Sequence, residues 1–145
     1  DWLEKYDNVK KACLNSDGAF LYSSNFSIGM NMLFKINKKL ASLIQAYDYE
    51  SLITETHHLE KLDSPSGTAI TLQEDLKIIL NKKTEIKSNR INDIIGTHKV
   101  VFSSKIDDIE IKHTAKSRDG FALGAIIAAE WILDKKGVYS IEDIF

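Results

Sequence analysis

A short run near the middle of the chain concentrates side chains that can bind anions and move protons. His57 and His58 are adjacent, and Lys61 follows three residues later. Imidazoles titrate near neutral pH, and a lysine held close to a substrate can also deliver a proton. Three basic side chains in so short a run repel one another unless something negative is bound. The spacing therefore favours an anion-binding site with a proton donor; the alternative is a surface strand end with incidental basic residues.

The residues after this run predict the start of a helix. They are small or turn-forming: Ser64, Pro65, Ser66, Gly67 and Thr68. Serine caps helices, proline is accepted in the first turn, and glycine lets the backbone come close to a ligand. Apolar residues then recur at helical spacing over 68–80. Because free N–H groups at a helix start favour an anion, the sequence predicts a pocket for a small carboxylate beside the basic run.

The strand that leads into the run brings a carboxylate to a histidine. Residues 49–56 predict a strand, and regular alternation places Glu55 and His57 on one face while His58 points the other way. A carboxylate beside a histidine favours the protonated imidazole. His113 lies on the apolar face of a later predicted strand, and we interpret it as a hydrogen-bonded core histidine.

Four segments have apolar residues at the spacing of amphipathic helices. They span 2–14, 28–46, 68–80 and 117–137. The methionine and leucine stripe of the second helix is typical of a core, not of a cofactor groove. The last helix is predicted to begin around Ser117-Arg118-Asp119-Gly120 and to end at Gly137.

Four further segments predict strands, at 19–22, 49–56, 99–102 and 109–113. The last two are joined near Asp107-Asp108 and predict an antiparallel hairpin, which forms a small mixed sheet with the strand at 49–56. Residues 81–95 are polar and predict a loop. Residues 138–145 predict a short closing segment with an extra turn of helix.

Composition excludes several classes of protein. The chain has 145 residues, 43% of them hydrophobic, with a formal net charge of −2, which offers no basic footprint for nucleic acid. No apolar run approaches the roughly 20 residues of a membrane span. Cys13 is the single cysteine, so no intrachain disulfide is possible and a cytoplasmic location is expected. It continues an apolar stripe, which predicts a buried structural thiol.

A metal site is a weaker alternative. The four histidines and Cys13 could in principle bind zinc, but no spacing matches a two-plus-two ligand pattern. No metal is therefore expected.

The central run closely resembles the signature of the 4-hydroxy-tetrahydrodipicolinate reductase (dihydrodipicolinate reductase) family of bacterial lysine and diaminopimelate synthesis. That signature is Glu-x-His-His-x-x-Lys-x-Asp-Ala-Pro-Ser-Gly-Thr-Ala. The matching residues are Glu55, His57, His58, Lys61, Asp63, Pro65, Ser66, Gly67, Thr68 and Ala69, with Ser64 in place of the alanine. Blocks at 24–31 and 113–125 also resemble the family, in the right order. Ile95 stands where the family usually has proline.

The resemblance implies roles for residues around the predicted pocket. His57 and Lys61 would be catalytic, as proton donors or acceptors. His58, Ser66, Gly67 and Thr68 would bind the substrate. Arg118 would bind a substrate carboxylate or fix an interdomain joint; a plain helix cap is an equal alternative.

A polar loop follows the strand at 19–22, where ligands of open α/β sheets bind. The resemblance implies that Ser23, Ser24, Asn25 and Phe26 contact NADH or NADPH; the alternative is an ordinary capping loop. The residue that would distinguish the two cofactors lies outside this sequence.

The resemblance also implies a fold and an assembly. We expect an α/β chain in which 1–27 with 118–145 are the remnant of a Rossmann-type dinucleotide-binding domain. Residues 28–117 would be an α+β domain for substrate binding and oligomerisation, with a small mixed, largely antiparallel sheet flanked by helices. The expected partners are a small dicarboxylate substrate and further copies in a homotetramer, with no nucleic acid or membrane.

The family begins with a dinucleotide-binding half that this sequence mostly lacks. The chain alone is therefore expected to be inactive in reducing 4-hydroxy-tetrahydrodipicolinate to tetrahydrodipicolinate. The alternative function is a non-catalytic module that binds dicarboxylates.

Overall fold

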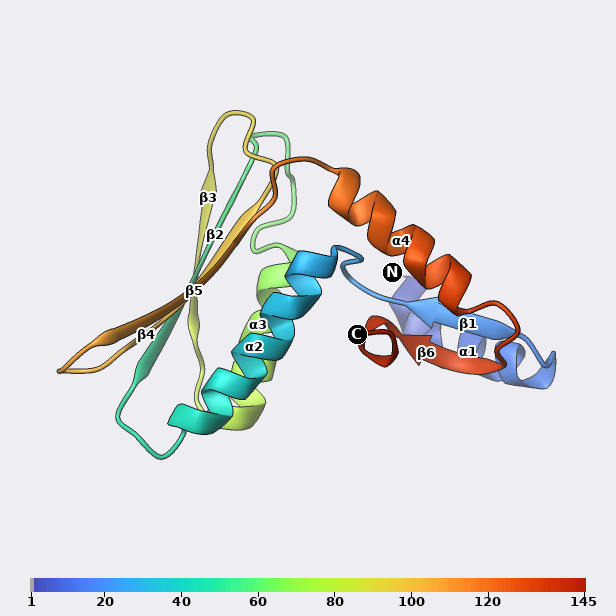
Figure 1. The fold of residues 1–145 in the computed structure, drawn as a ribbon, viewed down its shortest axis with the longest axis horizontal. Coiled ribbons are helices and arrows are strands. Elements are labelled where there is room, and N and C mark those ends of the chain that lie inside the picture. Colours follow the sequence, from blue (N-terminus) through green and yellow to red (C-terminus); the bar gives the residue numbers. More distant parts are fainter. Residues whose placement is uncertain (1) are drawn as a thin grey trace.

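The structure, a computed structural model, describes residues 2–145 and contains two sheets (Figure 1). The larger has four strands in the order β3-β2-β4-β5, and the smaller pairs β1 with β6. The strands are β1 (Ala19–Tyr22), β2 (Glu50–His57), β3 (Glu85–Arg90), β4 (Thr97–Ser103), β5 (Asp108–Thr114) and β6 (Gly137–Ser140). The helices are α1 (Tyr6–Asn15), α2 (Ile28–Ile44), α3 (Gly67–Leu80) and α4 (Asp119–Trp131), with 3-10 turns at Trp2–Lys5 and Ile141–Asp143.

The four-stranded sheet is mixed. β4 pairs antiparallel with both β2 and β5, whereas β3 pairs parallel with β2. Helices α2 and α3 cover one face of this sheet, and within residues 2–145 no helix covers the other (Figure 1). The core lies between helices and sheet because the strands alternate apolar residues toward the helices. Its fully buried members include Met30, Ala41, Ile53, Leu72, Leu76, Val100 and Phe102.

The second group of elements contains the two-stranded parallel sheet, α1 and α4 (Figure 1). β1 and β6 come from opposite ends of the chain, with Ala19 opposite Gly137. Cys13 is half-buried, not fully buried as predicted, and its thiol donates to the Gly137 carbonyl at 3.5 Å. No helix within residues 2–145 is long and apolar enough to cross a bilayer.

Most predicted elements are confirmed to within two residues: the strands at 19–22 and 49–56, the hairpin, and the helices at 28–46 and 68–80. The hairpin turn precedes Asp108, which is the first residue of β5.

The predicted loop at 81–95 is wrong, because Glu85–Arg90 forms β3. This is an edge strand bonded only to β2, and its inward residues after Ile86 are Ser88 and Arg90. The alternation is therefore between two kinds of polar residue, which a search for hydrophobic periodicity does not detect.

Two helix boundaries also differ from the prediction. The last helix ends at Trp131, and Gly137 starts β6 with φ of +121° instead of ending α4. The closing segment contains this unpredicted strand before its expected helical turn. Pro65 precedes the N-cap residue Ser66 and lies outside the first turn of α3.

Gly124 lies where α4 passes closest to the segment before α2. A Cβ at this position would be 1.7 Å from the carbonyl oxygen of Phe26, so any side chain forces backbone to move. Gly124→Ala should lower the free energy of unfolding by about 2 kcal/mol or more, measured by urea denaturation. Gly120→Ala is the control, because its Cβ would meet only the Ser27 hydroxyl at 3.9 Å. Equal stability of the two variants would show that α4 does not pack as described.

Candidate active site

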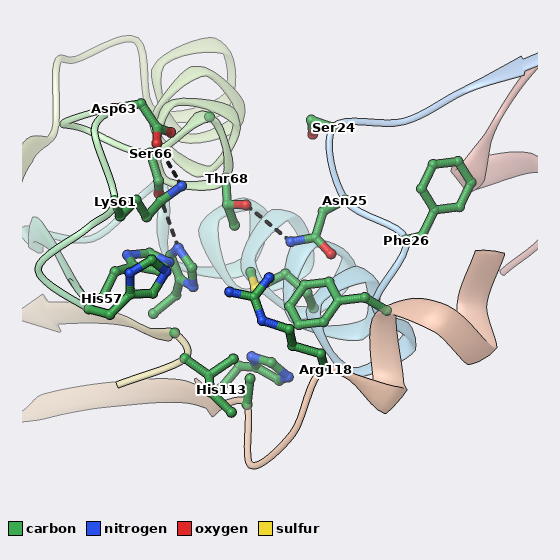
Figure 2. Close-up of a pocket in the computed structure, with 18 of the residues that line it drawn as sticks. Ser24, Asn25, Phe26, His57, Lys61, Asp63, Ser66, Thr68, His113 and Arg118 are labelled. Carbon is green, nitrogen blue, oxygen red and sulfur yellow. Dashed lines mark hydrogen bonds and ion pairs between the residues drawn. The ribbon is translucent and has the colours of Figure 1, made fainter. Parts of the chain in front are cut away.

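A cavity of about 500 Å³ opens where the end of β2, the start of α3 and the start of α4 converge (Figure 2). It is lined by residues from five parts of the chain, including Ser24, Asn25, Phe26, Met30, His57, His58, Lys61, Asp63, Ser66, Gly67, Thr68, His98, His113 and Arg118. Every residue that the sequence suggested as catalytic or substrate-binding therefore lies on its wall.

His57 occupies the last position of β2, on the buried face of the sheet. Its Nδ1 is 2.5 Å from a carboxylate oxygen of Glu55, which is fully buried two residues earlier on the same face. That contact sets the Nδ1 edge of the ring against the Glu55 carboxylate. The Nε2 edge lies against Gly96, where a Cβ would approach to 3.1 Å. The ring is thus held by a carboxylate on one edge and by bare backbone on the other.

Burial lowers the pKa of His57, and this effect outweighs the raising effect of Glu55. Lys61 and Arg90 lower the pKa of His57 further. The expectation that Glu55 favours the protonated imidazole is correct for the effect of Glu55 itself, but burial lowers the pKa of His57 more than Glu55 raises it, so the ring is neutral at neutral pH. Burial alone would raise the pKa of Glu55, but polar groups of Ser88, Ser66 and Arg90 hold it below its ordinary value.

Lys61 lies on the loop between β2 and α3. Its ammonium is 2.7 Å from the carboxylate of Asp63, which keeps it directed into the cavity mouth (Figure 2). The Lys61 hydrogen bond lowers the pKa of Asp63. Lys61 and His57 line the same cavity.

The start of α3 forms the side of the cavity where the sequence predicts a carboxylate to bind. Ser66 is the N-cap, and its hydroxyl accepts from the backbone N–H of Ala69 at 3.2 Å. Gly67 is the first helical residue, and a Cβ there would have no neighbour within 4 Å. Thr68 accepts from the side-chain amide of Asn25 at 3.1 Å. The helix therefore presents first-turn N–H groups beside an open space, as an anion requires.

The loop after β1 contributes three of its four predicted cofactor residues to the cavity. Ser24, Asn25 and Phe26 line it, whereas Ser23 does not and instead forms a local turn with Asn25. The ring of Phe26 points away from His57 (Figure 2). Since Asn25 bonds to Thr68, this loop is joined to the anion-binding helix start.

Arg118 and His113 complete the wall opposite Lys61. The guanidinium of Arg118 points into the cavity, and its side chain makes no capping bond to α4 (Figure 2). Arg118 stands at the N-cap position of α4 and contributes its backbone carbonyl, not its side chain, to that cap. His113 is half-buried and faces the cavity and the start of α2, where a Cβ on Gly29 would be 2.9 Å from its Nε2. Burial lowers the pKa of His113.

Sequence reasoning missed two residues that the fold brings to the site. His98 on β4 is 4% exposed, and its ring lies 5.0 Å from that of His57. Arg90 on β3 contacts Glu55. The alternation of side chains over 97–103 was a signal that could have placed His98 on the buried face of its strand. A strand predicted at 85–90 would likewise have placed Arg90 on the inward face.

Glu55, His57 and His98 offer ligand atoms within 4.8 Å of one another, a set that suits a metal ion by residue type. However, the carboxylate of Glu55 already contacts His57 and accepts from Arg90 at 3.1 Å and from the Ser66 N–H at 3.2 Å. These contacts fit proton handling better than metal coordination, because a cation would have to displace them.

His98 should make the protein sensitive to acid. Burial, followed by the charge effect of His57, lowers the pKa of His98 to about 3. As pH falls below 6.5, His98 takes up a proton in the unfolded chain but not in the folded chain. The contribution of His98 to the free energy of unfolding is therefore complete above pH 6.5 and falls as pH drops toward 3. In urea titrations between pH 5.5 and 4.5, His98→Gln should reduce the slope of unfolding free energy by about 1.4 kcal/mol per pH unit. An unchanged slope would contradict a buried neutral His98.

Comparison with known proteins gives consistent matches. Residues 29–145 match the family model described as "Dihydrodipicolinate reductase, C-terminus". A relative from Christiangramia forsetii, named 4-hydroxy-tetrahydrodipicolinate reductase, is 45% identical over 99% of this chain. A relative of the same name from Thermosipho africanus is 48% identical over 90% of this chain. The chain spans 65% and 58% of the length of these two relatives.

A solved structure has the same fold. It is described as a dipicolinate-bound dihydrodipicolinate reductase from a Paenisporosarcina species. It is 23% identical, has a TM-score of 0.73, and the match covers 98% of this chain and 60% of that one. The likeness confirms the expected α/β fold with small mixed sheets and helices.

Proposed function

This chain belongs to the dihydrodipicolinate reductase family, and from that premise we propose that it supplies the substrate site of an enzyme reducing 4-hydroxy-tetrahydrodipicolinate to tetrahydrodipicolinate. One observation carries the proposal. A single cavity is lined by a lysine and a histidine, which can exchange protons, and by a helix start, which suits a carboxylate. Membership of a biosynthetic family and the single cysteine support a cytoplasmic location.

A dicarboxylate fits the charges of this cavity. We assign one carboxylate to the first-turn N–H groups of α3 at Gly67 and Thr68, with the Ser66 cap fixing the helix start. The second carboxylate would meet His58 and Arg118, which line the same cavity. Two anion sites separated by a proton donor orient a flat dianion in one direction.

Proton delivery falls first to Lys61. Reduction places a hydride on one end of a double bond and requires a proton at the other end. The pKa of His57 is lowered by burial, so the ring is neutral in the free protein. A bound dianion would raise the pKa of His57 and allow it to share the proton with Lys61.

NADH or NADPH would supply the hydride. We assign Ser24, Asn25 and Phe26 to its binding, because this loop follows the carboxyl end of β1 and lines the same cavity as Lys61. We likewise assign 1–27 with 118–145 to the dinucleotide-binding part and 28–117 to substrate binding and oligomerisation.

The uncovered face of the four-stranded sheet would form a homotetramer. Leu52 and Val101 pair across β2 and β4 on this face, both half-buried, and supply apolar area. Val101→Asp should therefore reduce the particle mass in sedimentation while the monomer stays folded. A mass equal to one chain in the unmodified protein would refute the assembly.

The experiment that tests the function has two parts. The 145-residue chain is titrated with pyridine-2,6-dicarboxylate by calorimetry, and a form that also carries a dinucleotide-binding portion is assayed with NADH and NADPH. Binding together with turnover supports the reductase. Binding without turnover supports a dicarboxylate-binding module, and absence of both refutes the site.

A further inference from the structure

We propose that Arg90 is a positioning residue, whose guanidinium holds the Glu55 carboxylate and the Lys61 loop in the arrangement that proton transfer needs. The inference rests on the proposed function for its catalytic meaning, but its structural content can be measured without turnover. Arg90 does not line the cavity and acts only through residues that do.

The guanidinium donates to four acceptors, one of which is the neighbouring Asn89 carbonyl, reached by Nη1 at 2.7 Å. Nη2 donates to a Glu55 carboxylate oxygen at 3.1 Å and to the Asp63 carbonyl at 2.5 Å, while Nε donates to the Lys61 carbonyl at 3.2 Å. The side chain is 17% exposed, so these bonds are partly shielded from water. Asp63 is also the ion-pair partner of Lys61. Arg90 therefore fixes the backbone at both residues that determine where the Lys61 ammonium lies.

The same guanidinium is linked to His57 through Glu55. The Glu55 oxygen that accepts from Arg90 also accepts from the Ser66 N–H, and the other oxygen contacts Nδ1 of His57 at 2.5 Å. One buried carboxylate thus connects Arg90 to the proton-exchanging ring and to the cap of α3. Without the guanidinium this carboxylate would lose its nearest positive charge.

The register of β3 against β2 places Arg90 beside the strand end that carries His57. Arg90 is opposite His57 in the parallel pairing of β3 with β2. Beyond it, the Ile91 N–H donates to the His57 carbonyl at 2.8 Å, and the Leu59 N–H donates to the Asn92 carbonyl at 3.2 Å. The loop that carries Lys61 is therefore bonded to the β3 side along its first half by backbone and along its second half by Arg90.

Lysine cannot replace this arrangement. Its ammonium is a compact charge without the planar fork that reaches several acceptors at once. Arg90→Lys keeps a positive charge beside Glu55 but loses the bonds to the loop, whereas Arg90→Met loses both. The two variants separate the loss of charge from the loss of geometry. Lys83→Ala is the control, because Lys83 is exposed just before β3.

The first test uses the 145-residue chain. In Arg90→Lys, amide hydrogen exchange at Ser66 and in the loop over 59–64 should accelerate at least about tenfold, with no change at Val100 in the core. Unchanged exchange of the loop amides would overturn the proposal, and equal acceleration at Val100 would reduce Arg90 to a general stabiliser. Lys83→Ala should match the unmodified chain throughout.

The second readout is the titration of His57 by NMR. Its ring is faced by Glu55 from β2, Lys61 from the loop, Arg90 from β3 and His98 from β4. Removing the Arg90 charge in Arg90→Met should raise the pKa of His57, because an unfavourable cation is lost and the full Glu55 charge acts on the ring. A lowered or unchanged pKa would contradict the Arg90–Glu55–His57 connection.

The third readout is kinetic and uses a form with a dinucleotide-binding portion. Arg90→Lys should lower kcat at least about tenfold while KM and pyridine-2,6-dicarboxylate affinity stay within about threefold, because the start of α3 remains folded. Loss of affinity without loss of kcat would overturn the positioning role. If the unmodified protein shows no turnover, the proposed function fails, while hydrogen exchange and the His57 titration still decide whether Arg90 holds the loop.

Discussion

Replacing Lys61 with alanine should lower kcat by about two orders of magnitude or more, in a form of the protein that also carries a dinucleotide-binding portion. The Lys61 ammonium lines the cavity, whereas burial lowers the pKa of His57 and so leaves that ring a poorer proton donor in the free protein. Its loss removes both the proton and one positive charge facing the developing anion. Steady-state assays with substrate generated in place would measure the effect.

Lys105→Ala is a suitable control for this experiment. Lys105 is exposed in the β4–β5 turn, at the end of the sheet away from the cavity. A kcat for Lys61→Ala within threefold of the unmodified enzyme would refute the proton-donor role. His57→Gln should reduce kcat comparably, because the proposed dianion raises the pKa of His57 and the two groups then share one proton.

Gly67→Val should abolish most binding of pyridine-2,6-dicarboxylate, weakening the affinity by about 30-fold or more, a loss of about 2 kcal/mol. A Cβ at Gly67 would meet no protein atom within 4 Å, and Gly67 does not have a left-handed backbone. The fold should therefore accept the new side chain. The isopropyl group would instead occupy the space in front of the first-turn N–H groups.

Calorimetric titration of the folded variant tests this expectation. Lys77→Val is the control, because it places the same side chain on the exposed face of α3, about 15 Å along the helix from Gly67. Gly67→Ala should lie between the two, since a methyl group fills less of the pocket. Unchanged affinity in Gly67→Val would mean that the carboxylate does not bind at the start of α3.

The elements with strong periodicity can be predicted from sequence. β5 alternates cleanly, so the face predicted for it, with Ile109, Ile111 and His113, is correct. The apolar stripe predicted for α2 is only partly in the core. Leu33 and Ile44 are buried, whereas Met32, Ile36 and Leu43 are exposed, because the helix is rotated toward Met30, Phe34 and Ala41. β3 cannot be found this way, because an edge strand needs few apolar residues and its inward side chains bind a carboxylate instead of a core. The predicted end of α4 is wrong because a positive φ at Gly137 suits a strand entry as well as a helix end.

The candidate site is predictable only where its residues are close in sequence. Residues 55–68 contain a strand end, a loop and a helix start, and their local pattern is enough to place an anion site beside a proton donor. The contributions of His98 and Arg90 depend on strand pairing over 30 or more residues. The direction of the His57 pKa also depends on the fold, because burial, not the neighbouring carboxylate, is the dominant influence.

The pairing of β1 with β6 has a consequence for the order in which the chain folds. Ala19 meets Gly137, so this parallel pair closes a loop of roughly 120 residues, whereas the β4–β5 hairpin closes one of a few residues. Loop closure of that length slows the contact, and the four-stranded sheet with α2 and α3 should therefore form first. During synthesis the β1 segment leaves the ribosome roughly 120 residues before its partner strand β6, so its strand edge stays unpaired over that interval.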